Sequence, residues 1–202
     1  MATTTYICLF DLQTYYDRVV PPLALYRDEY NPKGVVRLLR EVSGILPELR
    51  REPGRILLDE DDYQHWVVSL EPDAGHKPSE QTMNDVAEMV IPPLCVPHGL
   101  GFNPMQDTDK LAPWLSERSK WFAALQDGSE ELAGEELEFT FGSGSLVATR
   151  RQIEQFLDEI RGIPAPGGPW SSLSGDFANL RKLVEKAKSE PAYTLLRTSL
   201  SR

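Results

Sequence analysis

The stretch over residues 137–162 constrains the fold most, because its hydrophobic period changes within a short distance. Leu137, Phe139 and Phe141 alternate with polar residues, which is the period of a half-buried strand. Over residues 149–161, apolar residues recur at steps of three and four, which predicts a helix with one inward stripe. The chain therefore combines strands with amphipathic helices, and we expect a fold of the α+β or α/β class.

Four segments have the residue types or the alternation of strands, and together they predict one mixed sheet of about four strands. They are residues 5–11, 55–58, 63–70 and 137–141. Amphipathic helices should pack on this sheet. One is expected to begin behind Asn31 as its cap, and another, starting near Thr82, should stop at Pro92 and Pro93.

A single globular domain is expected over residues 1–202, because 202 residues lie within the range that one core can serve. A hydrophobic fraction of 41% and a charged fraction of 26% are ordinary for such a domain. Residues 163–172 are rich in proline and glycine, and predict a linker to a C-terminal helical section over residues 174–200.

The N-terminal residues and the cysteines favour a soluble protein of the cytoplasm. The sequence MATTTYICLFDLQ has no basic region ahead of its apolar residues, unlike a secretory signal. No run approaches the roughly 18 apolar residues that a membrane-spanning helix needs, so no membrane partner is expected. Cys8 and Cys95 have apolar neighbours, and we expect both to be buried, reduced and unlinked.

Charge is distributed unevenly along the chain, which has a formal net charge of −10. Residues 59–140 hold 18 acidic and 4 basic side chains, whereas the segments before and after them are slightly basic. If this segment forms a continuous surface, its potential should repel nucleic acid and attract a basic protein surface. The alternative is a solvated face that only confers solubility.

Four side chains are candidates for catalysis, although none belongs to a strong motif. Cys95 and His98 could form a nucleophile and base, and Asp107 or Asp109 could orient the imidazole. A buried cysteine and a loop histidine are the plainer interpretation. The Gly142-Ser143-Gly144-Ser145 stretch lacks the spacing of a phosphate-binding loop and predicts a connecting turn.

Metal ligands are considered at two places, and neither predicts a bound ion. The acidic run over residues 59–62, with His65 close behind, has oxygen ligands but lacks the spaced order and the glycine of a calcium loop. The run is expected to be a solvated hairpin tip. A zinc site at Cys95 would need a second cluster of ligands that the sequence does not contain. No metal and no cofactor is therefore predicted.

Five residues of the acidic segment are candidates for binding a partner. Glu135, Glu136 and Glu138 would supply charge at the rim, and Trp114 and Trp121 would supply aromatic anchors if they are exposed. Tryptophans with helical spacing belong to a core more often than to a binding surface. Both interpretations of Trp114 and Trp121 remain open at this point.

Two functions from different classes follow from these patterns. The first is a non-catalytic interaction or regulatory protein, of the inhibitor or immunity type, whose acidic surface docks onto a basic protein. The second is a small hydrolase or transferase with a cleft near His98. The charge pattern and the weakness of the catalytic motifs favour the first, and neither predicts an oligomeric state.

Overall fold

The computed structural model describes residues 3–51, 60–70, 75–127 and 135–201. Contacts between residues group the chain into two compact units. Unit 1 comprises residues Met1–Phe10, Leu100–Leu137 and Gly142–Arg202, and unit 2 comprises Asp11–Gly99 and Glu138–Phe141. Helices and strands occur together, so the protein has an α+β fold, and this prediction is confirmed. The prediction of one domain over residues 1–202 stays a prediction.

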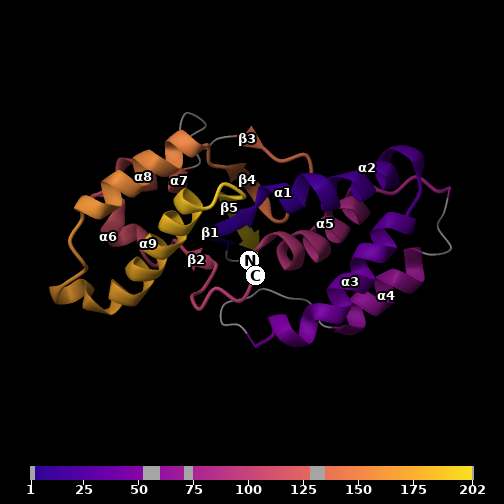
Figure 1. Ribbon diagram of the computed structural model, residues 1–202, viewed down its shortest axis with the longest axis horizontal. Helices are drawn as coiled ribbons and strands as arrows, with labels where there is room; N and C mark the ends of the chain where they lie inside the picture. The colour runs from indigo at the N-terminus through magenta and orange to yellow at the C-terminus, as the bar shows by residue number, and fades with distance from the viewer. Residues whose placement is uncertain (1–2, 52–59, 71–74, 128–134, 202) are drawn as a thin grey trace. The chain divides into compact units, whose positions relative to one another are not determined.

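Unit 1 contains a sheet with the strand order β2-β1-β5-β4-β3. The strands are β1 (Thr3–Asp11), β2 (Met105–Asp107), β3 (Glu135–Glu136), β4 (Ser143–Val147) and β5 (Tyr193–Ser201). The pairings of β1 with β2, β3 with β4 and β4 with β5 are antiparallel. The first strand of the chain therefore lies beside the last one, at the centre of the sheet (Figure 1).

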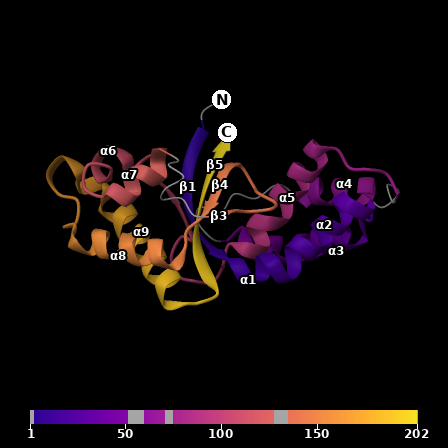
Figure 2. The ribbon, with the colours of Figure 1, turned by 90° about the horizontal axis from the view of Figure 1, so that it is seen from above.

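The helices of unit 1 gather on one side of this sheet (Figure 2). They are α6 (Ala112–Leu115), α7 (Lys120–Asp127), α8 (Arg150–Gly162), the 3₁₀ helix η4 (Gly168–Leu173) and α9 (Ser174–Ser189). Ile7 and Leu9 of β1 and Leu195 of β5 share one apolar cluster with Phe156 of α8 and Phe177 of α9. This cluster joins the sheet to its helices.

Unit 2 is helical. It contains α1 (Leu12–Thr14), the π-helix η1 (Tyr15–Val19), α2 (Val20–Glu29), α3 (Lys33–Leu49), α4 (Glu60–Leu70) and α5 (Glu80–Cys95). Helix α3 packs against α2, α4 and α5. The helix expected behind Asn31 is amphipathic, because its residues Val35, Leu38, Leu39, Val42 and Leu46, at steps of three and four, are buried. The Asn31 side chain accepts a hydrogen bond from the backbone N–H of Lys33 at 3.2 Å, close to its expected place as a cap.

The predicted strands have different outcomes. Residues 5–11 are part of β1, as expected, whereas residues 55–58 lie outside the described residues. The prediction for residues 63–70 is wrong, because they belong to α4. Tyr63, Val67 and Leu70 are buried at helical spacing, while Val68, which alternation would turn inward, is 68% exposed. Short apolar runs of this kind fit either period.

The strand predicted over residues 137–141 is also wrong, although its alternation is real. Leu137, Phe139 and Phe141 are buried and Glu138 is exposed, but the segment is irregular and precedes β4. The Tyr15 hydroxyl donates to the Phe139 carbonyl at 2.9 Å and accepts from the Phe139 N–H at 2.8 Å. A side chain thus takes the place of a neighbouring strand for this residue.

The two prolines of α5 do not stop the helix where expected, because α5 continues to Cys95. Proline lacks an N–H, so Pro93 cannot bond the carbonyl of Met89. That carbonyl accepts a hydrogen bond from the Tyr63 hydroxyl of α4 at 3.0 Å instead. The tyrosine therefore satisfies a group that the proline leaves open, and the helix tolerates the proline in its last turn.

The C-terminal part of unit 1 differs from its prediction in its second half. Residues 174–189 form α9, but Tyr193–Ser201 form β5, so the expected helical section over 174–200 is partly strand. The linker predicted over residues 163–172 includes most of the 3₁₀ helix η4. The expected turn at Gly142-Ser143-Gly144-Ser145 runs into β4, which begins at Ser143. None of the described helices is long and apolar enough to cross a membrane.

Helix α8 forms where the apolar spacing predicts a helix, and Thr149 is its N-cap. The Thr149 hydroxyl accepts from the N–H of Gln152, and the Gln152 side chain accepts from the N–H of Thr149 at 2.7 Å, which completes a capping box. The apolar stripe of the helix is buried: Ile153, Phe156, Leu157 and Ile160. Local signals were sufficient here because the cap and the stripe agree.

Candidate functional site

The cysteine and histidine proposed for catalysis have different surroundings. Cys95 is fully buried at the end of α5. Burial raises the pKa of its thiol, and the nearby carboxylate of Asp11 raises it further, so the thiolate is disfavoured. His98 is exposed, and the described residues offer its side chain no hydrogen bond or ion pair. Cys8, like Cys95, is a buried thiol, as expected.

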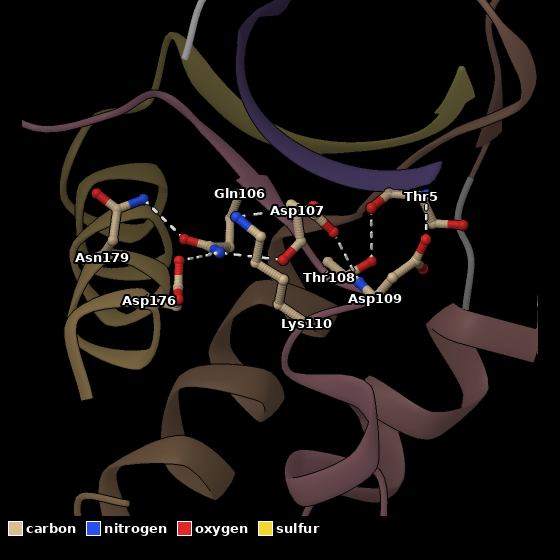
Figure 3. A network of polar contacts seen from close by, with 8 residues as sticks. All are labelled: Thr5, Gln106, Asp107, Thr108, Asp109, Lys110, Asp176 and Asn179. Atoms are coloured by element: carbon tan, nitrogen blue, oxygen red, sulfur yellow. Dashed lines mark hydrogen bonds and ion pairs between the residues drawn. The ribbon is translucent and has the colours of Figure 1, made fainter. Parts of the chain in front are cut away.

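Asp107, the third catalytic candidate, belongs to a polar network in unit 1 (Figure 3). Its carboxylate accepts from the N–H of Asp109 at 3.1 Å and lies 4.0 Å from the ammonium of Lys110. Asp109 in turn accepts from the N–H of Thr5 at 3.3 Å. The Thr108 hydroxyl donates to the Thr5 carbonyl at 2.8 Å, which fixes the end of β2 on β1.

The buried amide of Gln106 connects this network to α9. Its Nε2 donates to Asp176 at 3.1 Å, and its Oε1 accepts from Asn179 at 3.0 Å, as Figure 3 shows. A buried amide needs these partners, since an unpaired polar group costs about 1–3 kcal/mol. The carboxylates of Asp107, Asp109 and Asp176 all accept hydrogen bonds within the network, so its evident role is to hold β1, β2 and α9 together.

The acidic run predicted as a hairpin tip is instead the start of a helix. Asp59 lies outside the described residues, and Glu60, Asp61 and Asp62 form the exposed first turn of α4. Negative charge at this end interacts favourably with the helix dipole. Among the described residues, no group of three or more His, Cys, Asp or Glu side chains could hold a metal ion.

The three glutamates proposed for binding lie at and just after β3. Nothing is described of the Glu135 side chain, whereas Glu136 is exposed. Glu138 is exposed but engaged, because its carboxylate lies 2.9 Å from Arg27 of α2. The Arg27 guanidinium also lies over the ring of Phe139, 5.1 Å from its centroid. Part of the charge of this group is thus used within unit 2.

The two tryptophans proposed as anchors belong to the core of unit 1. Trp114 is 3% exposed and meets the ring of Phe177 edge-on at 4.9 Å. Trp121 is 2% exposed and stacks on Phe156 at 4.2 Å. Of the two interpretations that the spacing left open, both tryptophans therefore fit core packing.

Trp121 nevertheless lies at the wall of an open groove of about 660 Å³ between α7 and α8. Four polar side chains share this groove with it: Lys120, Gln155, Asp158 and Glu159. Glu159 accepts from the Ser119 hydroxyl at 2.6 Å and from the N–H of Trp121 at 3.1 Å, so it caps the start of α7.

The sequence alone did not identify these groove residues. Gln155, Asp158 and Glu159 occupy one face of α8 at a spacing of i, i+3 and i+4, which resembles any solvated helix face. Only the packing of α7 against α8 brings Lys120 and Trp121 to them. A local pattern could not have predicted the groove.

The functional meaning of these surfaces has to come from their own chemistry. Compared with protein-family models, curated proteins and solved structures, the chain shows no match. Burial, charge and hydrogen bonding therefore carry the assignment of function.

Proposed function

We propose that the protein is a non-catalytic interaction protein that docks onto a basic protein surface through the exposed faces of α4 and α5. One observation carries the proposal. Residues 59–99 hold nine acidic side chains and one basic side chain, Lys77. The exposed acidic residues on the two helices are Glu60, Asp61, Asp62, Glu80 and Glu88.

The two helices are neighbours within unit 2. Both pack on α3, and the hydrogen bond from Tyr63 to the Met89 carbonyl joins α4 directly to α5. Asp62 precedes Tyr63 and Glu88 precedes Met89, so acidic residues flank this joint on both helices. Charges gathered in this way create a stronger local field than the same charges dispersed.

Helix α4 also offers an apolar contact within its acidic face. Asp61, His65 and Val68 are all exposed and follow each other at i, i+4 and i+7, so they form one stripe. Val68 is 68% exposed, the highest value among the large exposed hydrophobic residues of the described ranges. An apolar residue beside charges is the usual composition of a protein interface at the border of its core and rim.

The charges chosen for a test should be those that the protein does not use itself. The described residues offer no ion pair to Glu60, Asp61 or Glu80. We expect the triple variant Glu60→Gln, Asp61→Asn, Glu80→Gln to associate with a basic partner more slowly, because exposed charges act mainly on the association rate. A partner captured on the wild-type protein would be measured by stopped-flow at low and at physiological salt.

The variant Glu135→Gln, Glu136→Gln, Glu138→Gln is a matched control with the same change of charge. Glu138 is already paired with Arg27, so this control should slow association less. Wild-type association should also slow as salt is added, since the Debye length falls to about 8 Å at physiological ionic strength. Equal rates for both variants and the wild type, or rates independent of salt, would refute docking through α4 and α5.

A further inference from the structure

Two of the large hydrophobic residues exposed on the described part of the chain lie along one continuous helix of unit 2. They are Tyr16 of η1, which is 48% exposed, and Leu25 of α2, which is 36% exposed. Between them, Pro21 is exposed, and Val20 and Ala24 are half-buried. Helix η1 continues directly into α2, so these five residues lie at helical spacing along one side. We call them the outer α2 stripe.

Helix α2 has apolar residues on both of its sides. Pro22, Leu23 and Tyr26 are buried on the inner side, where the helix packs on α3 and α5. The outer side has the stripe, which is unlike the outer side of α8, where the exposed residues are charged or polar. A helix that is apolar all round is normally covered all round. The outer α2 stripe therefore has the composition of a contact surface.

The apolar positions of the stripe are the same in both directions along the helix. Reversal about the midpoint between Val20 and Pro21 exchanges Tyr16 with Leu25 and Val20 with Pro21. When two identical helices cross antiparallel at this midpoint, each of these four residues meets an apolar residue of the other helix. A two-fold interface requires this kind of self-complementary surface. A second copy of the chain thus fits the stripe.

The charges beside the stripe favour the antiparallel direction. In a parallel pair, Asp17 would lie opposite Asp17 of the other copy, and Asp28 opposite Asp28, so like charges would repel each other. In the antiparallel pair, Asp17 lies opposite Ala24, and Asp28 lies opposite Gln13, an exposed amide that can donate to a carboxylate. The helix dipoles also attract each other when two helices run in opposite directions.

We propose that two copies of the chain pair antiparallel through the outer α2 stripe and form a symmetric dimer. The stripe is small beside the roughly 20–30 residues a side of a standard interface, so the dimer should be weak. Tyrosine is among the residues that contribute most to such contacts, which makes Tyr16 the expected anchor. The stripe lies outside α4 and α5, so this inference does not rest on docking through those helices, and either proposal can fail alone.

The first test is sedimentation equilibrium of the full-length protein between about 10 μM and 1 mM, the range in which a small interface dissociates. The average mass should rise with concentration from one chain towards two. Leu25→Glu changes an exposed side chain, so the protein should fold, and the unpaired charge in the contact should weaken association at least about tenfold. Val68→Glu adds the same charge at an exposed residue of α4, outside the stripe, and should leave association unchanged.

Cysteine cross-linking tests the direction of the pair. A disulfide needs Cα atoms within about 7 Å of each other. In the antiparallel pair, Tyr16 lies opposite Leu25 of the other copy, but about 14 Å along the axis from Tyr16 of that copy. On mild oxidation, an equimolar mixture of Tyr16→Cys and Leu25→Cys should therefore give more covalent dimer than either protein alone. The wild type should give none, because Cys8 and Cys95 are buried.

Three results would overturn the proposal. A single chain at every concentration would assign the stripe to a different protein. Association of Leu25→Glu as strong as that of the wild type, or an equal loss in Val68→Glu, would place self-association outside the stripe. A Tyr16→Cys protein that cross-links best with itself would replace the antiparallel pair with a parallel one.

Discussion

The two units satisfy their buried polar groups in different ways. Unit 1 relies on regular devices, namely the ladders of its sheet, the capping box of α8 and the amide network around Gln106. In unit 2, two buried tyrosines bond backbone groups that lack a regular backbone partner: Tyr15 bonds Phe139 in an irregular segment, and Tyr63 bonds the carbonyl of Met89 in α5. In unit 2, these backbone groups of Phe139 and Met89 therefore each depend on a single side-chain hydroxyl, whereas unit 1 bonds its backbone mainly through ladders and a capping box.

The surface of α4 and α5 also differs in its use of charge from the surface of the C-terminal helices. On the C-terminal helices of unit 1, Lys186 pairs with Glu190 and Lys188 pairs with Glu154. On α4 and α5 of unit 2, the described residues provide no such pair for Glu60, Asp61 or Glu80. Charge paired within the molecule is neutralised locally, so the carboxylates of Glu60, Asp61 and Glu80 should contribute more to the field that a partner meets than the paired charges do.

The largest effect is expected from the core of unit 1. Phe156→Ala removes a fully buried ring and the stack with Trp121, and should lower the free energy of unfolding by about 3–5 kcal/mol. Urea denaturation followed by far-ultraviolet circular dichroism measures this loss. The exposed Val68→Ala serves as the control, with an expected change within about 0.5 kcal/mol. A loss for Phe156→Ala no larger than that of the control would contradict the role given to the cluster.

A smaller effect is expected from the tyrosines of unit 2. Tyr15→Phe removes the hydroxyl that bonds both the N–H and the carbonyl of Phe139. The free energy of unfolding should therefore fall by about 2 kcal/mol. Tyr63→Phe removes a single bond and should cost about 1 kcal/mol. Amide hydrogen exchange gives the local readout: the Phe139 amide should exchange faster in Tyr15→Phe and at the wild-type rate in Tyr63→Phe.

That pair of variants also tests the contrast between the units. Each variant keeps the aromatic ring, so packing changes little and the hydroxyl is the only group lost. If Tyr15→Phe were as stable as the wild type, water would have to replace both hydrogen bonds, and the segment Glu138–Phe141 would be held by its buried phenylalanines alone.

Removing the cap of α8 should have a still smaller effect. Thr149→Ala loses the hydroxyl that accepts from the N–H of Gln152, and the free energy of unfolding should fall by about 1 kcal/mol. Thr149→Ser keeps an acceptor and should retain most of this stability, as urea denaturation would show. Equal losses for serine and alanine would mean that the methyl group, not the cap, matters.

The sequence predicts an element of the fold well when the residues that determine the element lie within the same short segment. Helix α8 was predictable because its cap and its apolar stripe lie within one short segment. The sequence did not predict the strand over residues 193–201 or the helix over residues 63–70. Short apolar runs fit both the helical and the strand period, and packing with distant segments decides between them. The prediction that the helix ends at Pro92 and Pro93 failed for a similar reason. Tyr63, which is distant in the sequence, donates to the Met89 carbonyl that Pro93 leaves without a bond.

The candidate sites, too, were predictable only where they depend on local sequence and not on packing between distant segments. The acidic composition of residues 59–99 was visible in the sequence, since charge needs no knowledge of packing. The groove was not, because Trp121 had to be buried against Phe156 and α8 had to lie beside α7. The sequence did suggest Trp121 as an aromatic anchor for a partner, but that role requires exposure and the side chain is buried.

The last prediction concerns alkaline pH. At neutral pH the ionisation of the buried tyrosines has no effect on the free energy of unfolding. Burial raises the pKa of Tyr15 and of Tyr63 from 10.0 to about 12. Between about pH 10 and 12, these hydroxyls stay protonated in the folded protein and ionise in the unfolded chain. The unfolded state then binds fewer protons, so the free energy of unfolding falls as the pH rises through this range. Their contribution is complete below pH 10 and is lost as the pH passes about 12. Urea denaturation at about pH 8 and about pH 11 should therefore show a smaller fall for the double variant Tyr15→Phe, Tyr63→Phe than for the wild type. An equal fall in both proteins would assign the alkaline loss to other groups, such as the buried thiol of Cys95.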